Sequence, residues 1–143
     1  MPEIENTDPE FWKVLNAHFG FKYDLACSAS NCLCPNGITK VENSLHQPWN
    51  ELPNWKFLNP PPENMGLWVD KCYEESKLGA KIVMLTQAET GSTWFKNFIW
   101  GKARIRFLSG NMENQPSNNL MISMFEPRIF MNPDVWEWRK GWE

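Results

Sequence analysis

The sequence predicts an α/β fold with a mostly parallel sheet in a single domain that spans residues 1–143. Segments with the pattern of strands alternate with segments with the pattern of helices, and this alternation is typical of layered α/β folds. The length of 143 residues suits one compact domain. A hydrophobic content of 42%, with nine Trp and nine Phe, is too high for a disordered chain and predicts a packed core.

The first half of the chain predicts one helix and two strands. A helix is expected over residues 8–18, because Asp8 suits the N-cap, Pro9 suits the first helical position and Gly20 can end it. Alternating residues predict a short strand over 21–26. Residues 35–54 are rich in Pro, Gly and Asn and are expected to form a loop with at most one short element. The apolar residues 55–58 predict a buried strand, which three prolines follow.

The second half predicts two more helices and three strands. Residues 64–78 have the apolar period of an amphipathic helix. The nearly continuous apolar segment 81–86 is typical of a strand that is covered on both faces. A short helix is expected over 93–100, strands over 103–108 and 120–125, and a loop over 109–119. For the tryptophan-rich tail from residue 133, a packed short helix and a partly loose end both stay open.

Several classes of protein and site are disfavoured by the composition. The chain has no run of 18 apolar residues, so no membrane helix is expected. Its acidic start lacks the basic and apolar segments of a signal peptide, and we therefore expect a cytoplasmic protein. The four cysteines are expected to be free thiols in that compartment. Their spacing is a poor zinc signature, and no metal site is predicted.

Charge is unevenly distributed along the chain. Residues 1–93 carry seven Lys and Arg against twelve Asp and Glu, whereas residues 94–143 carry seven against five. If DNA binds, its phosphates are expected to meet the basic cluster formed by Lys96, Lys102, Arg104 and Arg106. The alternative is an ordinary solvated surface, and the net charge of −3 does not by itself indicate a nucleic-acid binder.

Ligands of open α/β sheets bind at the carboxyl ends of the strands. Three such ends are chemically unusual here: residues 24–28, residues 59–62 and residues 86–90. The chain contains neither GxGxxG nor GxxxxGK[ST], which disfavours dinucleotide-binding and nucleotide-hydrolysing folds. The context of the two histidines does not suggest a Ser-His-Asp triad.

Asn59-Pro60-Pro61 is the strongest candidate for catalysis. The side-chain oxygen of Asn59 can accept one N–H of an exocyclic amine such as adenine N6, and a carbonyl of the prolines can accept the other. These bonds would expose the nitrogen lone pair to a methyl donor, and the rigid prolines fix both acceptors in advance. Taken alone, the motif favours the simpler interpretation of a proline-rich turn after a strand, because proline clusters are common in loops.

From Asp8 to about Pro127 the chain resembles the small phage and prophage DNA N6-adenine methyltransferases. No single segment carries this resemblance, but the ordered set is specific. The matching segments are Asp8-Pro9-Glu10-Phe11, Leu15-Asn16, Phe19-Gly20-Phe21, Tyr23 to Ser28 with Asn31, Ser44-Leu45 with Trp49, Phe57 to Pro61, Trp68-Val69, Glu74-Glu75, Val83-Met84-Leu85, Thr93-Trp94-Phe95 and Ile105 to Gly110.

The resemblance implies a small Rossmann-like fold that uses S-adenosylmethionine to methylate adenine N6 in DNA, in the host cytoplasm if the protein is phage-encoded. It implies that Asn59, Pro60, Pro61 and Pro62 form the catalytic motif. The residues implied to line the cofactor site are Asp8, Pro9, Phe11, Asp24, Ala26, Cys27 and Ser28. The residues expected to contact DNA are Trp94, Lys96, Lys102, Arg104 and Arg106.

The chain departs from the family pattern at two positions. The motif usually ends in an aromatic residue that stacks on the flipped base, and here that residue is Pro62. The Gly-Arg pair expected after the 105–108 strand is Gly110-Asn111. Stacking by Trp55, Trp68 or Trp94 could replace the missing ring, and so could contact of proline CH groups with the face of the base.

Several alternatives stay open at this point. Cytosine N4 offers an amine similar to adenine N6. A non-catalytic relative that binds cofactor or nucleic acid, and a small-molecule methyltransferase, are further readings. Recognition of a DNA sequence would fall to the loops 35–54 and 109–119 or to a second subunit, so a homodimer stays open.

Overall fold

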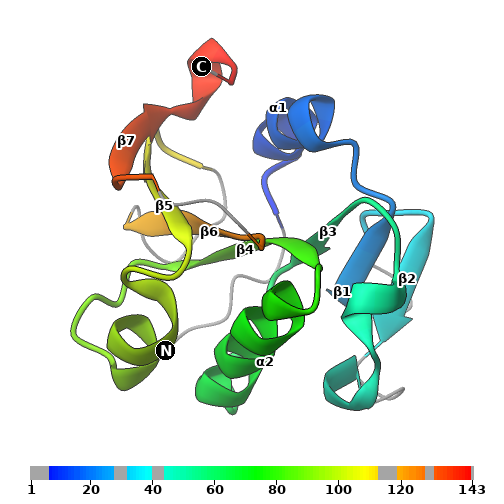
Figure 1. The fold of residues 1–143 in the computed structure, drawn as a ribbon. Coiled ribbons are helices and arrows are strands. Elements are labelled where there is room, and N and C mark those ends of the chain that lie inside the picture. The colour runs from blue at the N-terminus through cyan, green and yellow to red at the C-terminus, as the bar shows by residue number, and fades with distance from the viewer. Residues whose placement is uncertain (1–6, 28–31, 40–43, 113–118, 128–130, 143) are drawn as a thin grey trace.

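The computed structural model describes residues 7–27, 32–39, 44–112, 119–127 and 131–142. Its centre is a seven-stranded sheet with the order β2-β1-β3-β4-β6-β5-β7. Helices α1 (Pro9–Phe19) and α2 (Met65–Lys77) lie on opposite sides of this sheet (Figure 1). The strands are β1 (Tyr23–Cys27), β2 (Asn36–Thr39), β3 (Trp55–Leu58), β4 (Lys81–Gln87), β5 (Arg104–Ser109), β6 (Leu120–Phe125) and β7 (Asp134–Glu137).

The sheet is mixed, which corrects the expectation of a mostly parallel one. Strands β2, β1, β3 and β4 pair in parallel, and β7 pairs in parallel with β5. Strand β6 is antiparallel to both β4 and β5. The physical reason is the short link between Ser109 and Leu120, since a parallel connection needs a dozen or more residues, usually with a helix.

Two edge strands were not predicted. Strand β2 lies in the segment 35–54 that was expected to be a loop, together with the 3-10 helices η2 (Ser44–His46) and η3 (Trp49–Glu51). Strand β7 and the 3-10 turn η5 (Trp138–Lys140) form the tail, so it is neither a loose end nor only a short helix. Among the described residues each edge strand pairs on one side, and Ile38 is the one large apolar residue of β2.

The core has two parts, one on each face of the sheet. On β4, Ile82 and Met84 pack in the cluster that contains residues of α2, whereas Val83 and Leu85 pack in the cluster that contains residues of α1. This alternation is the period of two that a buried strand imposes. The tail completes the second cluster, because the ring of Phe11 in α1 lies 5.4 Å from the ring of Trp138.

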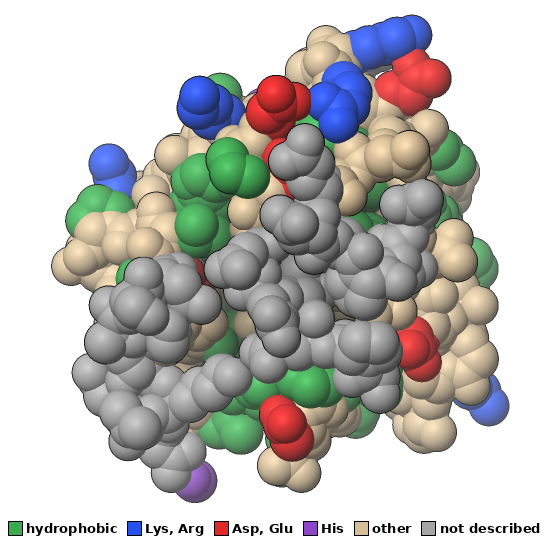
Figure 2. Space-filling view, turned by 180° about the vertical axis from the view of Figure 1, so that it is seen from behind, with side chains coloured by type: hydrophobic (Ala, Val, Ile, Leu, Met, Phe, Trp, Pro, Cys, Tyr) green, Lys and Arg blue, Asp and Glu red, His purple; other side chains and the backbone are tan. Residues whose placement is uncertain are grey.

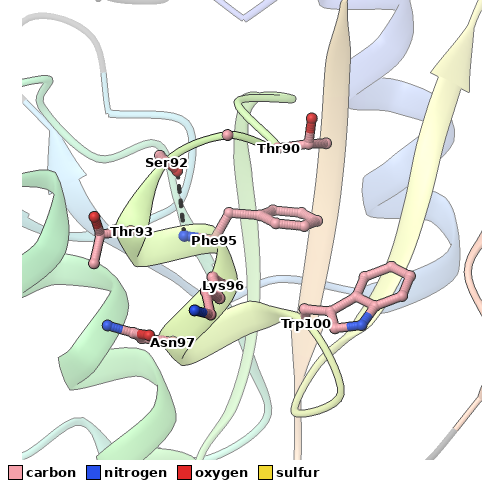
Figure 3. A pocket seen from close by; sticks show the side chains of 8 residues that line it. Thr90, Ser92, Thr93, Phe95, Lys96, Asn97 and Trp100 are labelled. Carbon is pink, nitrogen blue, oxygen red and sulfur yellow. Dashed lines mark hydrogen bonds between the residues drawn. The ribbon is translucent and has the colours of Figure 1, made fainter.

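Between β4 and β5 the chain forms a single turn of π-helix, η4 (Phe95–Ile99), where a short helix was expected over 93–100. The backbone N–H of Trp100 donates to the carbonyl of Phe95 over 2.9 Å, which closes the wide turn. Phe95 and Ile99 are buried against the cluster on the α2 side. Figure 3 shows this turn and the side chains around it.

The surface of the described residues carries mixed charge. On the face in Figure 2, Lys and Arg side chains lie along the upper edge, with Asp and Glu side chains beside them. Within the described part of the chain, no helix has both the length and the apolar character needed to cross a membrane.

Candidate functional site

The predicted catalytic motif begins one residue after the carboxyl end of β3, between two parallel neighbours. Phe57 pairs with Asp24 of β1, and Leu58 pairs with Met84 of β4. Asn59 and Pro62 are half-buried, whereas Pro60 and Pro61 are buried. Helix α2 begins only at Met65, so the prolines lead the chain along the edge of the sheet where ligands of α/β folds bind.

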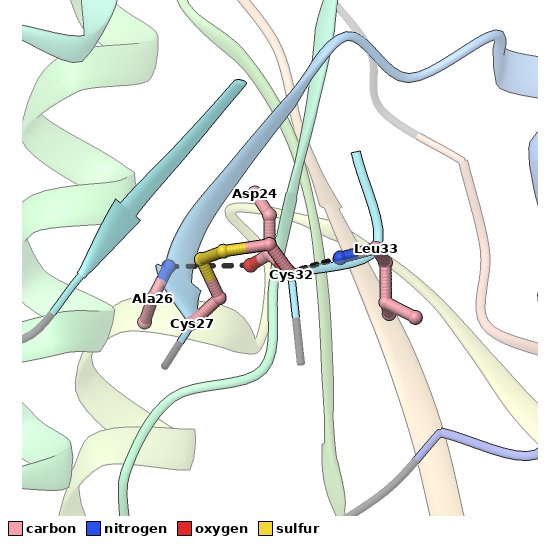
Figure 4. Close-up of a disulfide and its surroundings, with 5 residues drawn as sticks. All are labelled: Asp24, Ala26, Cys27, Cys32 and Leu33. Carbon is pink, nitrogen blue, oxygen red and sulfur yellow. Dashed lines mark hydrogen bonds between the residues drawn. A yellow bond between two sulfur atoms is a disulfide. The ribbon is translucent and has the colours of Figure 1, made fainter. Parts of the chain in front are cut away.

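Asp24 anchors the chain that leaves β1. One oxygen of its buried carboxylate accepts a hydrogen bond from the N–H of Ala26 over 3.3 Å, and the other accepts from the N–H of Leu33 over 3.2 Å (Figure 4). Burial raises the pKa of Asp24, while these two hydrogen bonds act in the opposite direction. The carboxylate therefore ties the carboxyl end of β1 to the chain that returns toward β2.

The same connection contains a disulfide between Cys27 and Cys32 (Figure 4). This corrects the expectation of four free thiols, although Cys34 and Cys72 are free and buried. The bond depends on Gly37 of β2, because a Cβ atom at that position would overlap both sulfur atoms. Spacing along the chain could not reveal this contact between the bond and Gly37. Ser28 lies outside the described residues.

The three predicted cofactor residues at the N-terminus build the start of α1. Asp8 is a buried N-cap whose carboxylate accepts from the N–H of Glu10 over 2.8 Å and from the N–H of Phe11 over 3.3 Å. Pro9 occupies the first helical position. Phe11 has no exposed surface and packs against Trp136 and Trp138, so the structure places it in the core.

The predicted DNA-contacting cations are divided between the two faces of the sheet. Lys96 is exposed, and Lys102 lies on the α2 side, where its ammonium sits 5.4 Å from the ring centre of Tyr73. Arg104 and Arg106 lie on the other side, over the ring of Trp142. Arg106 is buried and paired with Asp134 of β7, so its guanidinium is not presented to solvent.

The three tryptophans that could replace the missing aromatic residue lie in different parts of the fold. Trp55 begins β3 and so lies at the opposite end of the strand from Asn59. Trp68 is buried and stacked on Trp49, with ring centres 6.1 Å apart. Trp94 is half-buried and directly precedes η4, in the segment that leaves the carboxyl end of β4.

Arg139 was not singled out from the sequence. This residue lies beside Gly110-Asn111, where the family pattern has a Gly-Arg pair. Its guanidinium donates to the backbone carbonyl of Asn111 over 2.7 Å and to the carboxylate of Glu10 over 2.8 Å. Half of the side chain is exposed. Position 139 is distant in the sequence from residue 111, and the pairing of β7 with β5, which was not predicted, brings the two segments close together.

Comparison with known proteins gives a consistent result. A family model described as DNA N-6-adenine-methyltransferase (Dam) matches residues 4–134. A DNA N-6-adenine-methyltransferase of Escherichia phage T1 is 26% identical over 119 residues, which are 82% of this chain and 49% of that protein. The chain thus spans about half the length of this curated relative. The family model covers most of the chain, and the chain belongs to the DNA N-6-adenine-methyltransferase (Dam) family.

Proposed function

We propose that the protein transfers a methyl group from S-adenosylmethionine to the N6 amine of adenine in DNA. Membership of the family supports this reaction class. The observation that carries the proposal is the position of Asn59, Pro60 and Pro61 at the carboxyl end of β3, between β1 and β4. An open α/β sheet offers a ligand site at this edge, and the motif supplies two acceptors for an amine.

Asn59 and the prolines orient the amine. The amide oxygen of Asn59 accepts one N–H, and the carbonyl of Pro60 accepts the other, so the nitrogen lone pair turns out of conjugation with the ring. An amide oxygen accepts hydrogen bonds and is not a base at neutral pH, so the proton that the amine loses passes to water. Burial of Pro60 and Pro61 holds the acceptors in place before substrate arrives, which is the preorganisation that such a site needs.

The residues at the end of β1 fit a cofactor through their backbone more than through their side chains. S-adenosylmethionine, when bound, supplies an electrophilic methyl group on a sulfonium. Both carboxylate oxygens of Asp24 already accept hydrogen bonds from backbone amides, and the sulfur of Cys27 is in a disulfide. Asp24 and Cys27 would therefore shape the site, and the backbone at Ala26 would lie nearest Asn59 if the register of β1 and β3 continues.

DNA would approach from the side on which the loop after β4 lies. Adenine N6 is sheathed in the duplex, so the base must leave the stack before it can react. Lys96 and Lys102 are proposed phosphate contacts, and Trp94 is a proposed ring for the extruded base. Arg104 and Arg106 support the tail, and Arg139 is an exposed arginine on the α1 side of the sheet.

A second candidate function is binding without turnover, and Pro62 is the observation that favours it. Stacking on an aromatic ring contributes roughly 1–3 kcal/mol per base. The side chain of a half-buried proline offers no π-face, so the extruded base would be held less well. In this case the protein would bind cofactor or DNA with no product. Methylation of cytosine N4 would use the same acceptors and differs only in the product.

The experiment is nucleoside mass spectrometry on unmethylated DNA after incubation with the protein and S-adenosylmethionine. N6-methyladenine is expected with the wild type and with Asn59→Asp, because a carboxylate oxygen also accepts an N–H. Asn59→Ala is expected to give none, whereas Asn132→Ala, at an exposed position, is the matched control. A folded wild type that binds cofactor and gives no methylated base would refute the enzyme and favour binding alone.

A further inference from the structure

A pocket of about 600 Å³ opens beside the π-helical turn η4 (Figure 3). Its volume falls within the range of roughly 300–1,000 Å³ that is usual for small-ligand sites. The pocket belongs to the segment that connects β4 to β5, and neither the catalytic motif nor the proposed cofactor residues contribute to it. It is lined by Thr90, Gly91, Ser92, Thr93, Phe95, Lys96, Asn97 and Trp100.

The π-turn creates an aromatic surface in this pocket. In an α-helix, residues five apart would point about 140° away from each other. The wider turn instead brings the rings of Phe95 and Trp100 to 6.0 Å between centres, at an angle of 35°. Figure 3 shows the Phe95 ring between Thr90 and Trp100. Trp100 is 56% exposed, although an indole of this size is usually largely buried.

Polar groups surround the rings. Lys96 is exposed and lines the pocket, as do Thr93 and Asn97. The hydroxyl of Ser92 is already engaged, because it donates to the carbonyl of Glu89 and accepts from the N–H of Phe95. The ammonium of Lys102 donates to the carbonyl of Asn97 and adds a second positive charge beside the pocket. A flat ring surface next to an ammonium group is complementary to a base with its phosphate.

We propose that this pocket binds an unpaired nucleotide of a single-stranded DNA segment, with its base against Trp100 and its phosphate at Lys96. The proposal deepens the proposed function and rests on it, since it names the form of DNA that the protein engages. A base can stack on Trp100 only when its face is free, so a fully paired duplex does not fit. π-turns occur often at functional sites, which agrees with a binding role for η4.

The nucleotide in this pocket is a neighbour of the target base and not the target itself. The segment that contains the pocket leaves the carboxyl end of β4 and runs toward the start of β5 on the α2 side. Asn59 stays at the carboxyl end of β3, on the adjacent strand. Trp100 is therefore proposed as a contact for DNA and not for the amine that reacts.

The test is fluorescence anisotropy with a labelled single-stranded oligonucleotide and with its duplex. The wild type is expected to bind the single strand more tightly than the duplex. Trp100→Ala is expected to weaken single-strand binding about 5- to 150-fold, and Trp100→Phe to restore part of it. Lys96→Gln is expected to lower the salt dependence, with the slope of log K against log salt reduced by about 0.7.

Matched controls come from exposed positions on β7 and η5 that do not line the pocket. Val135→Ala removes an apolar side chain that is 68% exposed on β7, and Lys140→Gln removes a lysine charge on η5. Neither is expected to change the affinity for the single strand. Equal affinities of the wild type and Trp100→Ala, or tighter binding of the duplex, would overturn the proposal.

A free nucleotide is the other source of the same chemistry, and competition with deoxyadenosine monophosphate distinguishes it. The monophosphate is expected to compete only weakly, because a strand presents several contacts and the monophosphate presents one. Competition at the affinity of the oligonucleotide would overturn the assignment to DNA. The methylation assay distinguishes failure of this proposal from failure of the proposed function. If the protein methylates adenine but its binding of the single strand does not depend on Trp100, the pocket is not a DNA site and the enzymatic function stands.

Discussion

Arg106 of β5 and Asp134 of β7 are partners in the strand register and are joined by two hydrogen bonds of 2.9 Å each. The guanidinium also lies over the rings of Trp136 and Trp142, with distances of 5.2 and 4.6 Å to their centres. Because the Arg106 side chain is only 5% exposed, this pair fastens the tail to the sheet. An arginine expected to meet DNA thus has a structural role.

Asp134→Ala is expected to destabilise the fold, because it leaves the buried guanidinium of Arg106 without its carboxylate. Asp134 is 43% exposed, so the loss of free energy of unfolding should be about 1–3 kcal/mol, below the value for a fully buried pair. Urea unfolding measures it. Glu137→Ala, which removes an exposed i,i+3 pair with Lys140, should change it by less than about 0.5 kcal/mol. Equal effects of the two substitutions would contradict the structural role of Arg106.

The sequence predicts the central elements because their patterns are local. The strands 55–58 and 120–125 are found with the predicted bounds, and the helix predicted over 64–78 spans 65–77. The prolines after residue 58 ended the strand as expected and so fixed the place of Asn59 at its carboxyl end. A continuous apolar segment, or a proline that ends a strand, can be recognised in the sequence without knowing which strands lie beside it.

The edges of the sheet and the contacts that depend on them could not be predicted. Strands β2 and β7 are short, and pairing with one neighbour stabilises each of them. The disulfide lies against Gly37 of β2, which has no Cβ atom to overlap it, and the buried Arg106 pairs with Asp134 of β7. The expected compartment indicated free thiols and proximity in the sequence indicated a single basic cluster, where the structure has a crosslink and two separate groups of cations.

Pro62→Tyr is expected to increase methyl transfer, because it supplies the aromatic ring that the catalytic motif lacks. Stacking worth about 1–3 kcal/mol would raise kcat/KM about 5- to 150-fold. Steady-state assays with oligonucleotide substrates measure this change. Pro53→Tyr adds the same ring at an exposed position before β3 and should leave kcat/KM unchanged. An equal kcat/KM for Pro62→Tyr and the wild type would show that another group already holds the base.

The double substitution Cys27→Ser and Cys32→Ser is expected to lower the free energy of unfolding. The disulfide closes a loop with a sequence separation of 5, and loop-closure entropy predicts a contribution of about 2 kcal/mol. Unfolding in urea under oxidising conditions measures it. Reductant should bring the wild type down to the level of the variant and should leave the variant unchanged. A wild type that is insensitive to reductant and equal in stability to the variant would exclude a contribution from this bond.

The buried Lys56 should make stability depend on pH. Burial on β3 and the nearby charge of Lys81 lower the pKa of Lys56 from 10.5 to about 8, although Glu75 acts in the opposite direction. Between pH 8 and 10.5 the unfolded chain then binds more protons than the folded protein at this position. The free energy of unfolding is therefore expected to rise with pH across this window. Below about pH 8 Lys56 is charged in the folded protein, and its burial then destabilises the fold to the full extent.

Lys56→Met removes this penalty together with the hydrogen bond that the ammonium donates to the carbonyl of Asn54 over 2.7 Å. The net effect at pH 7 is expected to be a gain of about 1–2 kcal/mol in the free energy of unfolding. The gain should shrink as the pH rises from 8 to 10.5, because the wild-type lysine becomes neutral there. Lys13→Met, at an exposed position of α1, is the matched control and should leave the free energy of unfolding at pH 7 nearly unchanged. A difference between Lys56→Met and the wild type that stays constant from pH 7 to 10.5 would mean that Lys56 remains charged in the folded protein.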